Sequence, residues 1–247
     1  MAPLVHAAAQ APGITTLTLD SPANRNALST ALVAELRAAL ATAAADPGTR
    51  AVVLTHTGTT FCAGADLKSP CDPADFLALL RELTELPKPV VARVTGHVRA
   101  GGLGLLGACD IAAAGPQSSY AFTETHLGLA PAVISMTLLP RLDPRAASRY
   151  FLTAEPFDAA EAARIGVLTL HTTGDLDAAL HPLLDGLRKA SPQALAETKT
   201  LVTAGVREAL ARNGTRLTEL SARLFASDEA REGITARFER RDPSWAR

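Results

Sequence analysis

A glycine-rich stretch that follows an apolar segment limits the folds open to this chain more than any other feature. The apolar residues 89–95 predict a buried strand, and the small residues 100–102 then open a short apolar helix that ends near Cys109. The N–H groups in the first turn of a helix have no intrahelical partner and carry the positive end of its dipole. Glycine also lets a ligand approach the backbone closely. This turn can therefore hold an anion, or an oxygen that becomes negative during a reaction.

The same glycines also fit a competing pattern, because Gly102, Gly104 and Gly107 spell G-x-G-x-x-G. A nicotinamide-binding fold requires the strand to run straight into the first glycine and a full crossover helix to follow. Here six residues separate the strand from Gly102, and strand-like sequence resumes at Asp110. Glu124 stands near the position of the ribose-binding acid, but the spacing disfavours dinucleotide binding. Close helix packing remains the other explanation of these glycines.

The composition argues against several classes of protein. A net charge of −1 argues against nonspecific nucleic-acid binding and against a basic membrane-facing surface. Cys62, Cys71 and Cys109 lack the spacing of a zinc site and fit a reducing compartment. The N-terminus lacks the pattern of a signal peptide, and no apolar run is long enough to span a membrane. We expect a cytoplasmic protein without a metal, nucleic-acid or membrane partner.

Strand-like and helix-like segments alternate before residue 175, which predicts an α/β fold with a largely parallel sheet. The predicted strands are 5–9, 14–19, 51–55, 89–95, 110–114, 120–122 and 167–171, and the predicted helices are 30–45, 72–86, 100–109, 131–139, 144–152 and 155–165. From residue 175 onward we predict four helices, broken at Ser191-Pro192, Asn213-Gly214 and Ser227-Asp228. The change from an α/β pattern to helices alone suggests a core domain at 1–190 and a C-terminal helical region at 191–247.

Two loops rich in small residues, each after a predicted strand, could grip one carbonyl oxygen from two sides. At this point the sequence resembles the enoyl-CoA hydratase/isomerase (crotonase) superfamily, in five blocks that occur in the family's order. The blocks are Pro22–Leu28 (PANRNAL), Phe61–Leu67 (FCAGADL), Gly96–Asp110, Phe122–Pro131 (FTETHLGLAP) and Glu232–Trp245. The resemblance implies the repeated ββα units of the ClpP/crotonase spiral and a C-terminal helical trimerisation region. It also implies a homotrimer or homohexamer.

The resemblance assigns a role to the backbone of each loop. In this family the N–H groups that match Ala65 and Gly101 form an oxyanion hole, which binds the thioester oxygen of an acyl-CoA substrate and stabilises an enolate. The resemblance implies no metal and no separate cofactor, because CoA arrives with the substrate.

Four further residues match the loops that cradle CoA in the family. These residues are Arg25, the natural phosphate partner, with Ala63, Asp66 and Leu67. We expect the Asp66 side chain to organise its loop by accepting backbone N–H bonds. The tail residues Phe238 to Trp245 match a region that contacts CoA or a neighbouring subunit, or they form an amphipathic packing helix.

The sequence departs from the family at one catalytic position. Hydratases of the family hold a water between two glutamates; Glu124 matches one of them, but the other position is Gly104. We therefore expect an enoyl-CoA hydratase with one acid/base group. The alternatives are a Δ3,Δ2-enoyl-CoA isomerase and a non-catalytic acyl-CoA binder. Asp72, Asp75 or Glu82 could supply the missing carboxylate, and His126 is expected to be structural.

Overall fold

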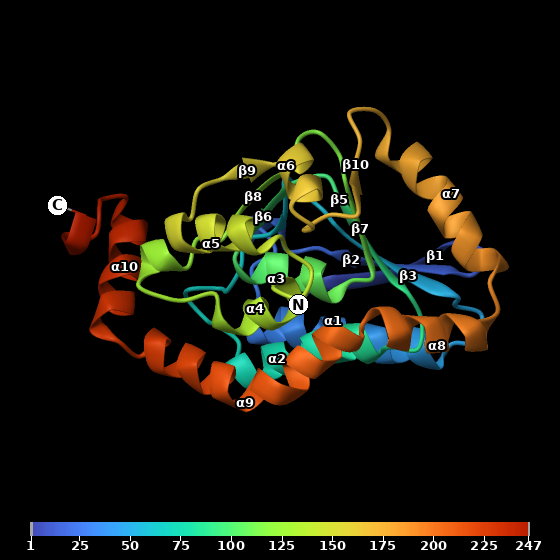
Figure 1. The fold of residues 1–247 in the computed structure, drawn as a ribbon, viewed down its shortest axis with the longest axis horizontal. Coiled ribbons are helices and arrows are strands. Elements are labelled where there is room, and N and C mark those ends of the chain that lie inside the picture. The colour runs from blue at the N-terminus through green and yellow to red at the C-terminus, as the bar shows by residue number, and fades with distance from the viewer. Residues whose placement is uncertain (1, 247) are drawn as a thin grey trace.

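The computed structural model describes residues 2–246, and its strands form two sheets (Figure 1). The larger sheet has the order β1-β2-β3-β5-β7-β10, with bounds Val5–Ala11, Ile14–Leu19, Ala51–His56, Val90–Val94, Ile111–Ala114 and Leu170–His171. Strands β1 and β2 form an antiparallel hairpin, and every later strand pairs in parallel with its neighbour. The predicted parallel sheet is confirmed.

The helices occupy most of the remaining chain. They are α1 (Thr30–Ala45), α2 (Pro73–Glu85), α3 (Gly101–Ala108), α4 (Ala132–Leu138), α5 (Pro144–Thr153), α6 (Ala159–Arg164), α7 (Leu176–Lys189), α8 (Pro192–Val202), α9 (Ala204–Phe225) and α10 (Asp228–Glu239). Short 3-10 turns are η1 (Pro22–Asn24), η2 (Thr125–Leu127) and η3 (Ser244–Ala246). Ser29 caps α1, because its side chain accepts from Leu32 N–H at 3.2 Å.

Strand β3 shows how the larger sheet is covered on both faces. All of its residues are buried, as expected for a parallel strand with a β-branched apolar run. Val52 and Leu54 belong to the main core, which includes the apolar faces of α1 and α2. Ala51 and Val53 point the other way and pack beneath α7. The sheet is therefore sandwiched between two helical layers (Figure 1).

The smaller sheet positions the functional segments, and it was not predicted in full. Its order is β4-β6-β8-β9, with bounds Thr60–Cys62, His97–Arg99, Ser119–Ala121 and Phe157–Asp158. Strands β4, β6 and β8 run parallel, so their carboxyl ends meet at one edge. The segments of β4 and β6 were predicted as loops, because three residues are too few to show a strand periodicity.

Three predicted element boundaries were wrong. The segment predicted as one helix over 155–165 instead contains strand β9 followed by α6. The predicted strand at 167–171 is reduced to Leu170–His171. Helix α9 runs through Asn213-Gly214, and the break falls at Thr203. Gly214 serves close packing instead, since a methyl group there would lie 2.7 Å from an Arg81 side-chain nitrogen on α2.

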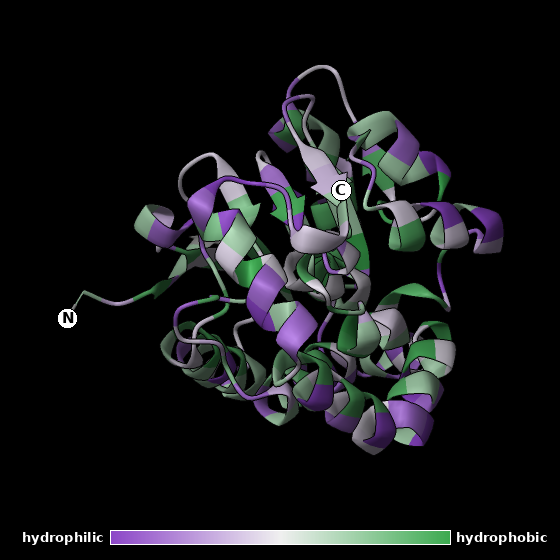
Figure 2. Cartoon of the chain, turned by 90° about the vertical axis from the view of Figure 1, so that its left-hand side faces the viewer, coloured by the Kyte–Doolittle hydropathy of each residue, from purple (hydrophilic) through white to green (hydrophobic). Residues whose placement is uncertain are grey.

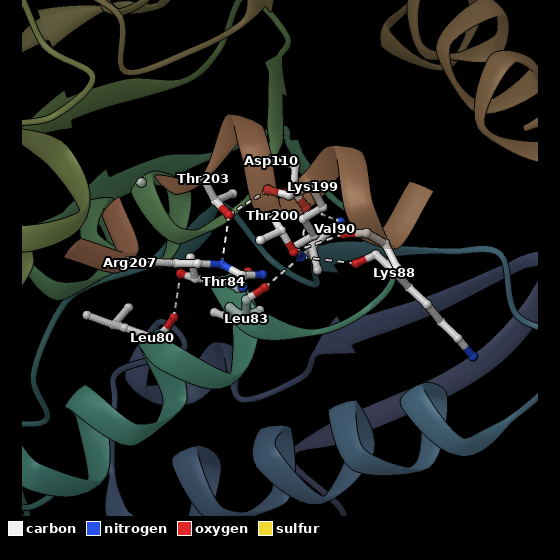
Figure 3. Close-up of polar contacts among 12 residues, drawn as sticks. Leu80, Leu83, Thr84, Lys88, Val90, Asp110, Lys199, Thr200, Thr203 and Arg207 are labelled. Atoms are coloured by element: carbon white, nitrogen blue, oxygen red, sulfur yellow. Dashed lines mark hydrogen bonds and ion pairs between the residues drawn. The ribbon is translucent and has the colours of Figure 1, made fainter. Parts of the chain in front are cut away.

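A buried ion pair ties α8 to the sheet (Figure 3). Lys199 Nζ lies 2.9 Å from Asp110 Oδ2 and donates to the carbonyls of Leu83 and Lys88 at 2.8 and 3.0 Å. The same Asp110 oxygen accepts from Val90 N–H at 2.7 Å. Burial lowers the pKa of Lys199, and the Asp110 carboxylate opposes that shift. All three ammonium protons thus have an acceptor, which a buried charge requires.

The distribution of hydropathy agrees with this layered arrangement. In Figure 2, which looks onto the end of the molecule that carries the C-terminus, the helical ribbons change between hydrophobic and hydrophilic colours along their length. This is the pattern of amphipathic helices with one buried face. No helix of the described chain combines the length and the apolar character that crossing a membrane requires.

Candidate active site

The first site segment is the loop that follows β4. Leu28 N–H donates to Gly64 O at 2.8 Å, and Asp66 N–H donates to Leu28 O at 3.3 Å, so Leu28 and Ala65 form a parallel bridge. In such a bridge Leu28 bonds to the residues before and after Ala65, and the N–H of Ala65 itself points away from Leu28. The loop therefore leaves the Ala65 N–H available to a ligand.

The second segment is the turn between β6 and α3. Ala100 has φ 46° and ψ −118°, a conformation that L-residues rarely adopt and that costs about 1–3 kcal/mol. Its N–H donates to Ala121 O at 3.1 Å, and its carbonyl accepts from Leu103 N–H at 2.8 Å. Gly101 is the first residue of α3, so its N–H has no intrahelical acceptor. The strained turn thus fixes the direction of a free N–H group.

The two loops touch at their glycines. A methyl group on Gly64, which has φ 88°, would lie 2.9 Å from Ala100 Cβ and 3.4 Å from Gly101 N. A methyl group on Gly101 would lie 3.6 Å from Gly64 Cα. Only glycine permits this approach. The backbones that carry the Ala65 and Gly101 N–H groups therefore lie side by side.

The third segment follows β8 and carries Glu124, whose side chain is buried. Glu124 is 8% exposed, and its Oε2 atom has no hydrogen-bond partner within the described chain. Burial raises the pKa of Glu124 from its ordinary value of 4.5 to about 7. This carboxyl can therefore exchange a proton near neutral pH, which is the property required of a general acid or base.

All three segments converge at the same edge of the smaller sheet. Ala100 N–H donates to Ala121 O, and this hydrogen bond connects the second segment to the third. Gly101 directly follows Ala100, and Glu124 lies three residues after Ala121. Leu67 packs with Leu127 and Leu129, which connects the Ala65 loop to the segment of Glu124. Ligands of α/β proteins commonly bind at the carboxyl ends of parallel strands.

The side chains that surround Gly104 form an apolar wall of the candidate site. A methyl group on Gly104 would lie 2.5 Å from Ile134 Cγ2 and 3.3 Å from Phe76 Cζ. The Phe76 ring would also lie 3.6 Å from a methyl group on Gly101. Ile134 and Phe76 were not predicted as site residues, because no local pattern indicates which side chains of α2 and α4 face α3. They fill the space where a side chain at position 104 would stand.

The three carboxylates considered as replacements are engaged elsewhere. Asp72 caps α2 by accepting from Ala74 N–H at 2.7 Å. Glu82 makes a bidentate pair with Arg37, and Asp75 lies 3.5 Å from the same guanidinium. The geometry therefore does not support any of them as a second acid/base group beside Glu124.

The residues expected to bind CoA lie together at the surface of the first loop. The carbonyl of Arg25 accepts from Ala63 N–H at 3.1 Å. The Arg25 side chain is exposed and makes no ion pair with any residue of 2–246, so it is available to an anion. Asp66 accepts from Lys68 N–H at 3.0 Å and from Asn24 Nδ2 at 3.1 Å, as expected for a residue that organises its loop.

Asn26 is a supporting residue that was not predicted from the sequence. It is fully buried with φ 53°, and its side-chain amide donates to Thr57 O and Thr60 O at 3.1 and 2.8 Å. Its Oδ1 accepts from Ser21 N–H at 2.7 Å. Asn26 thus fastens the loop of Arg25 to the start of β4. The Asn-Arg-Asn sequence was the available signal, because asparagine tolerates positive φ.

Two cavities lie away from this edge. One, of about 310 Å³, is lined in part by Asp110 and Arg141, and the other, of about 420 Å³, is lined in part by Tyr150 and Glu161. Neither includes Ala65, Gly101 or Glu124. The candidate site therefore rests on the convergence of the three strand ends and on the buried carboxyl.

The fold and the candidate site define an α/β protein in which two backbone N–H groups and a buried carboxyl meet at one sheet edge, and comparison with known proteins identifies its family. The sequence profile of the enoyl-CoA hydratase/isomerase family matches residues 9–247, and the chain belongs to this family. It is 30% identical to the 2,3-dehydroadipyl-CoA hydratase of Escherichia coli K12 over 93% of both chains. It is also 32% identical to the carnitinyl-CoA dehydratase of Proteus mirabilis over 81% of this chain and 82% of that one.

Solved structures agree with this assignment. An enoyl-CoA hydratase from Mycobacterium avium matches with a TM-score of 0.93 and 52% identity, over 99% of this chain and 100% of that one. A carnitinyl-CoA hydratase from the same species matches with a TM-score of 0.87 and 26% identity, over all of both chains. The predicted crotonase-like fold with a helical C-terminal region is confirmed, and the chain is an enzyme of this family.

Proposed function

We propose that this enzyme adds water across the double bond of a 2-enoyl-CoA thioester. The observation that carries the proposal is the buried Glu124 carboxyl, with an unpartnered oxygen and a pKa of about 7, beside two loops with free N–H groups. The names of the related hydratases support the same reaction.

In the proposed reaction the N–H groups of Ala65 and Gly101 donate to the thioester oxygen. Electron density moves onto this oxygen as the nucleophile attacks C3, so the two donors bind the enolate more tightly than the substrate. Losing one such donor typically costs about 2.7–4 kcal/mol of transition-state stabilisation. The strained turn at Ala100 keeps Gly101 oriented before the substrate arrives.

Glu124 moves the protons of the reaction. As a carboxylate it takes one proton from water while the oxygen of that water bonds to C3, and it then returns a proton to C2. The product gains OH at C3 and H at C2, and Glu124 ends in its starting state. A pKa of about 7 suits both steps, because proton transfer is most effective when the catalytic pKa lies near the working pH.

The CoA part of the substrate is assigned to the loop of Ala63, Asp66 and Leu67, with Arg25 as the partner of a phosphate group. Addition of water is redox-neutral, so the proposed reaction needs no cofactor beyond the CoA that the substrate carries.

Isomerisation of a 3-enoyl-CoA thioester is the second candidate, and the apolar wall at Gly104 favours it. Ile134 and Phe76 offer no polar group to hold a water opposite Glu124. A single carboxyl can take a proton from C2 and return it to C4, which shifts the double bond without adding water.

Turnover of matched 2-enoyl-CoA and 3-enoyl-CoA thioesters tests both candidates. We expect water addition to the 2-enoyl compound, and a loss of about 10²-fold or more in kcat for Glu124→Gln. The exposed Glu197→Gln is the matched control and should retain full activity. Conversion of the 3-enoyl compound without hydration would establish the isomerase. Binding of both thioesters without turnover would make the chain an acyl-CoA binder.

We also propose that the enzyme assembles as a homotrimer or homohexamer. Leu152, Leu201 and Val202 are 75%, 76% and 67% exposed, and assembly is one way to cover such apolar side chains. Light scattering of the purified chain tests this, and a monomeric mass would contradict it.

A further inference from the structure

Helix α10 packs against the segment of Glu124 through an unusually close backbone contact. Its main contacts with other helices are those with η2 and α9. A methyl group on Gly233 of α10 would lie 2.6–2.8 Å from the backbone atoms of Leu127 in η2. A methyl group on Gly128 would lie equally close to the backbone of Glu229 and Ala230. The two backbones are therefore in direct contact at two glycines.

A short chain of bonds connects this contact to Glu124. Leu127 N–H and Leu129 N–H both donate to the backbone carbonyl of Glu124, at 2.9 and 3.0 Å. A displacement of Leu127 by α10 must therefore move the backbone of Glu124 or break one of these bonds. The contacted residue and the carboxyl-bearing residue belong to the same turn.

The same contact extends to the first loop of the site. Leu127, Leu129 and Ala230 form a small apolar cluster, which we call the C-terminal cluster, with Leu67, Leu224 and Phe225 packed against it. Leu67 follows Ala65 by two residues. The end of α9 and the start of α10 thus support both the loop of Ala65 and the segment of Glu124.

We propose that Gly233 is a positioning residue, through which helix α10 fixes the Glu124 segment for the reaction. The inference rests on the proposed function of Glu124. It gives the C-terminal helix a role within its own chain, since α10 packs on the site segment of the same molecule. Asp228, Glu229 and Arg231, the charged residues at the start of α10, are exposed, and none of them contributes to the raised pKa of Glu124. The effect of α10 is therefore one of position and exclusion of water.

Gly233→Ala tests the proposal directly. Alanine is a better helix former than glycine, so the variant does not weaken α10 itself. Its methyl group must push η2 away, and we expect kcat to fall about 10-fold or more while KM changes less than about twofold. Gly186→Ala in α7 is the matched control, because a methyl group there meets no atom within 4 Å. An unchanged kcat for Gly233→Ala, or an equal loss in Gly186→Ala, would overturn the proposal.

A second variant covers the case in which Gly233→Ala does not fold. The side chain of Ser227 caps α10 by accepting from Ala230 N–H at 3.1 Å, and Ser227→Ala loosens the start of the helix. It should also lower kcat more than it raises KM, and an unchanged kcat in the folded variant would count against the proposal.

A measurement without turnover separates this inference from the proposed function. Glu124→Gln should raise the denaturation midpoint at about pH 8.5, because it removes a buried charge. In the Gly233→Ala background that rise should shrink by about half or more, since water then reaches the carboxyl. An undiminished rise would overturn the inference even if the wild-type enzyme acts on neither thioester. Failure of the wild type to turn over, with the rise diminished, would count only against the proposed function.

Discussion

Replacing Glu124 with glutamine is expected to stabilise the fold at alkaline pH while it removes activity. Burial raises the pKa of Glu124 from 4.5 to about 7, so the folded state disfavours the charged carboxylate. A group with a raised pKa stabilises the folded state fully below its unfolded pKa, and that contribution is lost as the pH rises through the folded pKa. Above pH 7 the wild type therefore holds a charge that glutamine avoids.

The size of the effect follows from the two pKa values. The gap between 4.5 and about 7 corresponds to about 3 kcal/mol in the free energy of unfolding. At about pH 8.5 we expect glutamine to add this amount, which raises Tm by roughly 6–12 °C for a chain of this length. Near pH 4.5 both side chains are neutral in the folded state, and most of the difference should vanish.

Chemical denaturation followed by circular dichroism at both pH values measures the difference. Glu161→Gln is an instructive control, because hydrogen bonds from Arg164 and Tyr150 lower the pKa of Glu161 to about 2. Its stabilising contribution is present at high pH, so this second variant should lose stability where Glu124→Gln gains it. Equal stability of Glu124→Gln and wild type at about pH 8.5 would refute the claim that burial sets the pKa of Glu124.

Three further predictions concern other parts of the molecule. Lys199→Met leaves Asp110 buried without its partner, and denaturation should show a loss of about 3–5 kcal/mol, part of which Lys199→Met/Asp110→Asn recovers. Ala100→Gly relieves the strained turn before α3, and its denaturation midpoint should rise by an amount equivalent to about 1 kcal/mol at most; a fall would contradict the strain. Arg25→Ala should raise KM for the CoA thioester about 10-fold with kcat held, and an unchanged KM would remove Arg25 from the CoA site.

The sequence predicted most of the larger sheet and its helices well, because strands β1, β2, β3 and β5 and most of the helices are long enough to show a period. The turn of Gly101 was also evident from residues alone, since glycines after an apolar strand point to a free helix end. Strands β4 and β6 were not predicted, because three-residue strands show no periodicity and their pairing joins residues far apart in the sequence. Their absence from the prediction hid the reason why the site segments meet.

Glu124 could be singled out only through family resemblance, because an isolated glutamate is ordinarily a surface charge. Its burial is a result of tertiary packing, which no local pattern in the sequence specifies. The same holds for Gly233 and Ile134, whose importance comes from atoms far away in the chain. Asn213-Gly214 was misread for a related reason, since Gly214 serves packing against α2 inside an unbroken helix.

The contact between Gly104 and Ile134 restricts the order in which mutations can alter this enzyme. A glutamate introduced at position 104 would meet Ile134 Cγ2 at its first carbon, so the substitution is disfavoured as a single step. Shortening Ile134 first would open the space, but it would leave a cavity until a larger residue arrived at position 104. The two positions are therefore epistatic, and each route to a second carboxylate passes through a less stable intermediate.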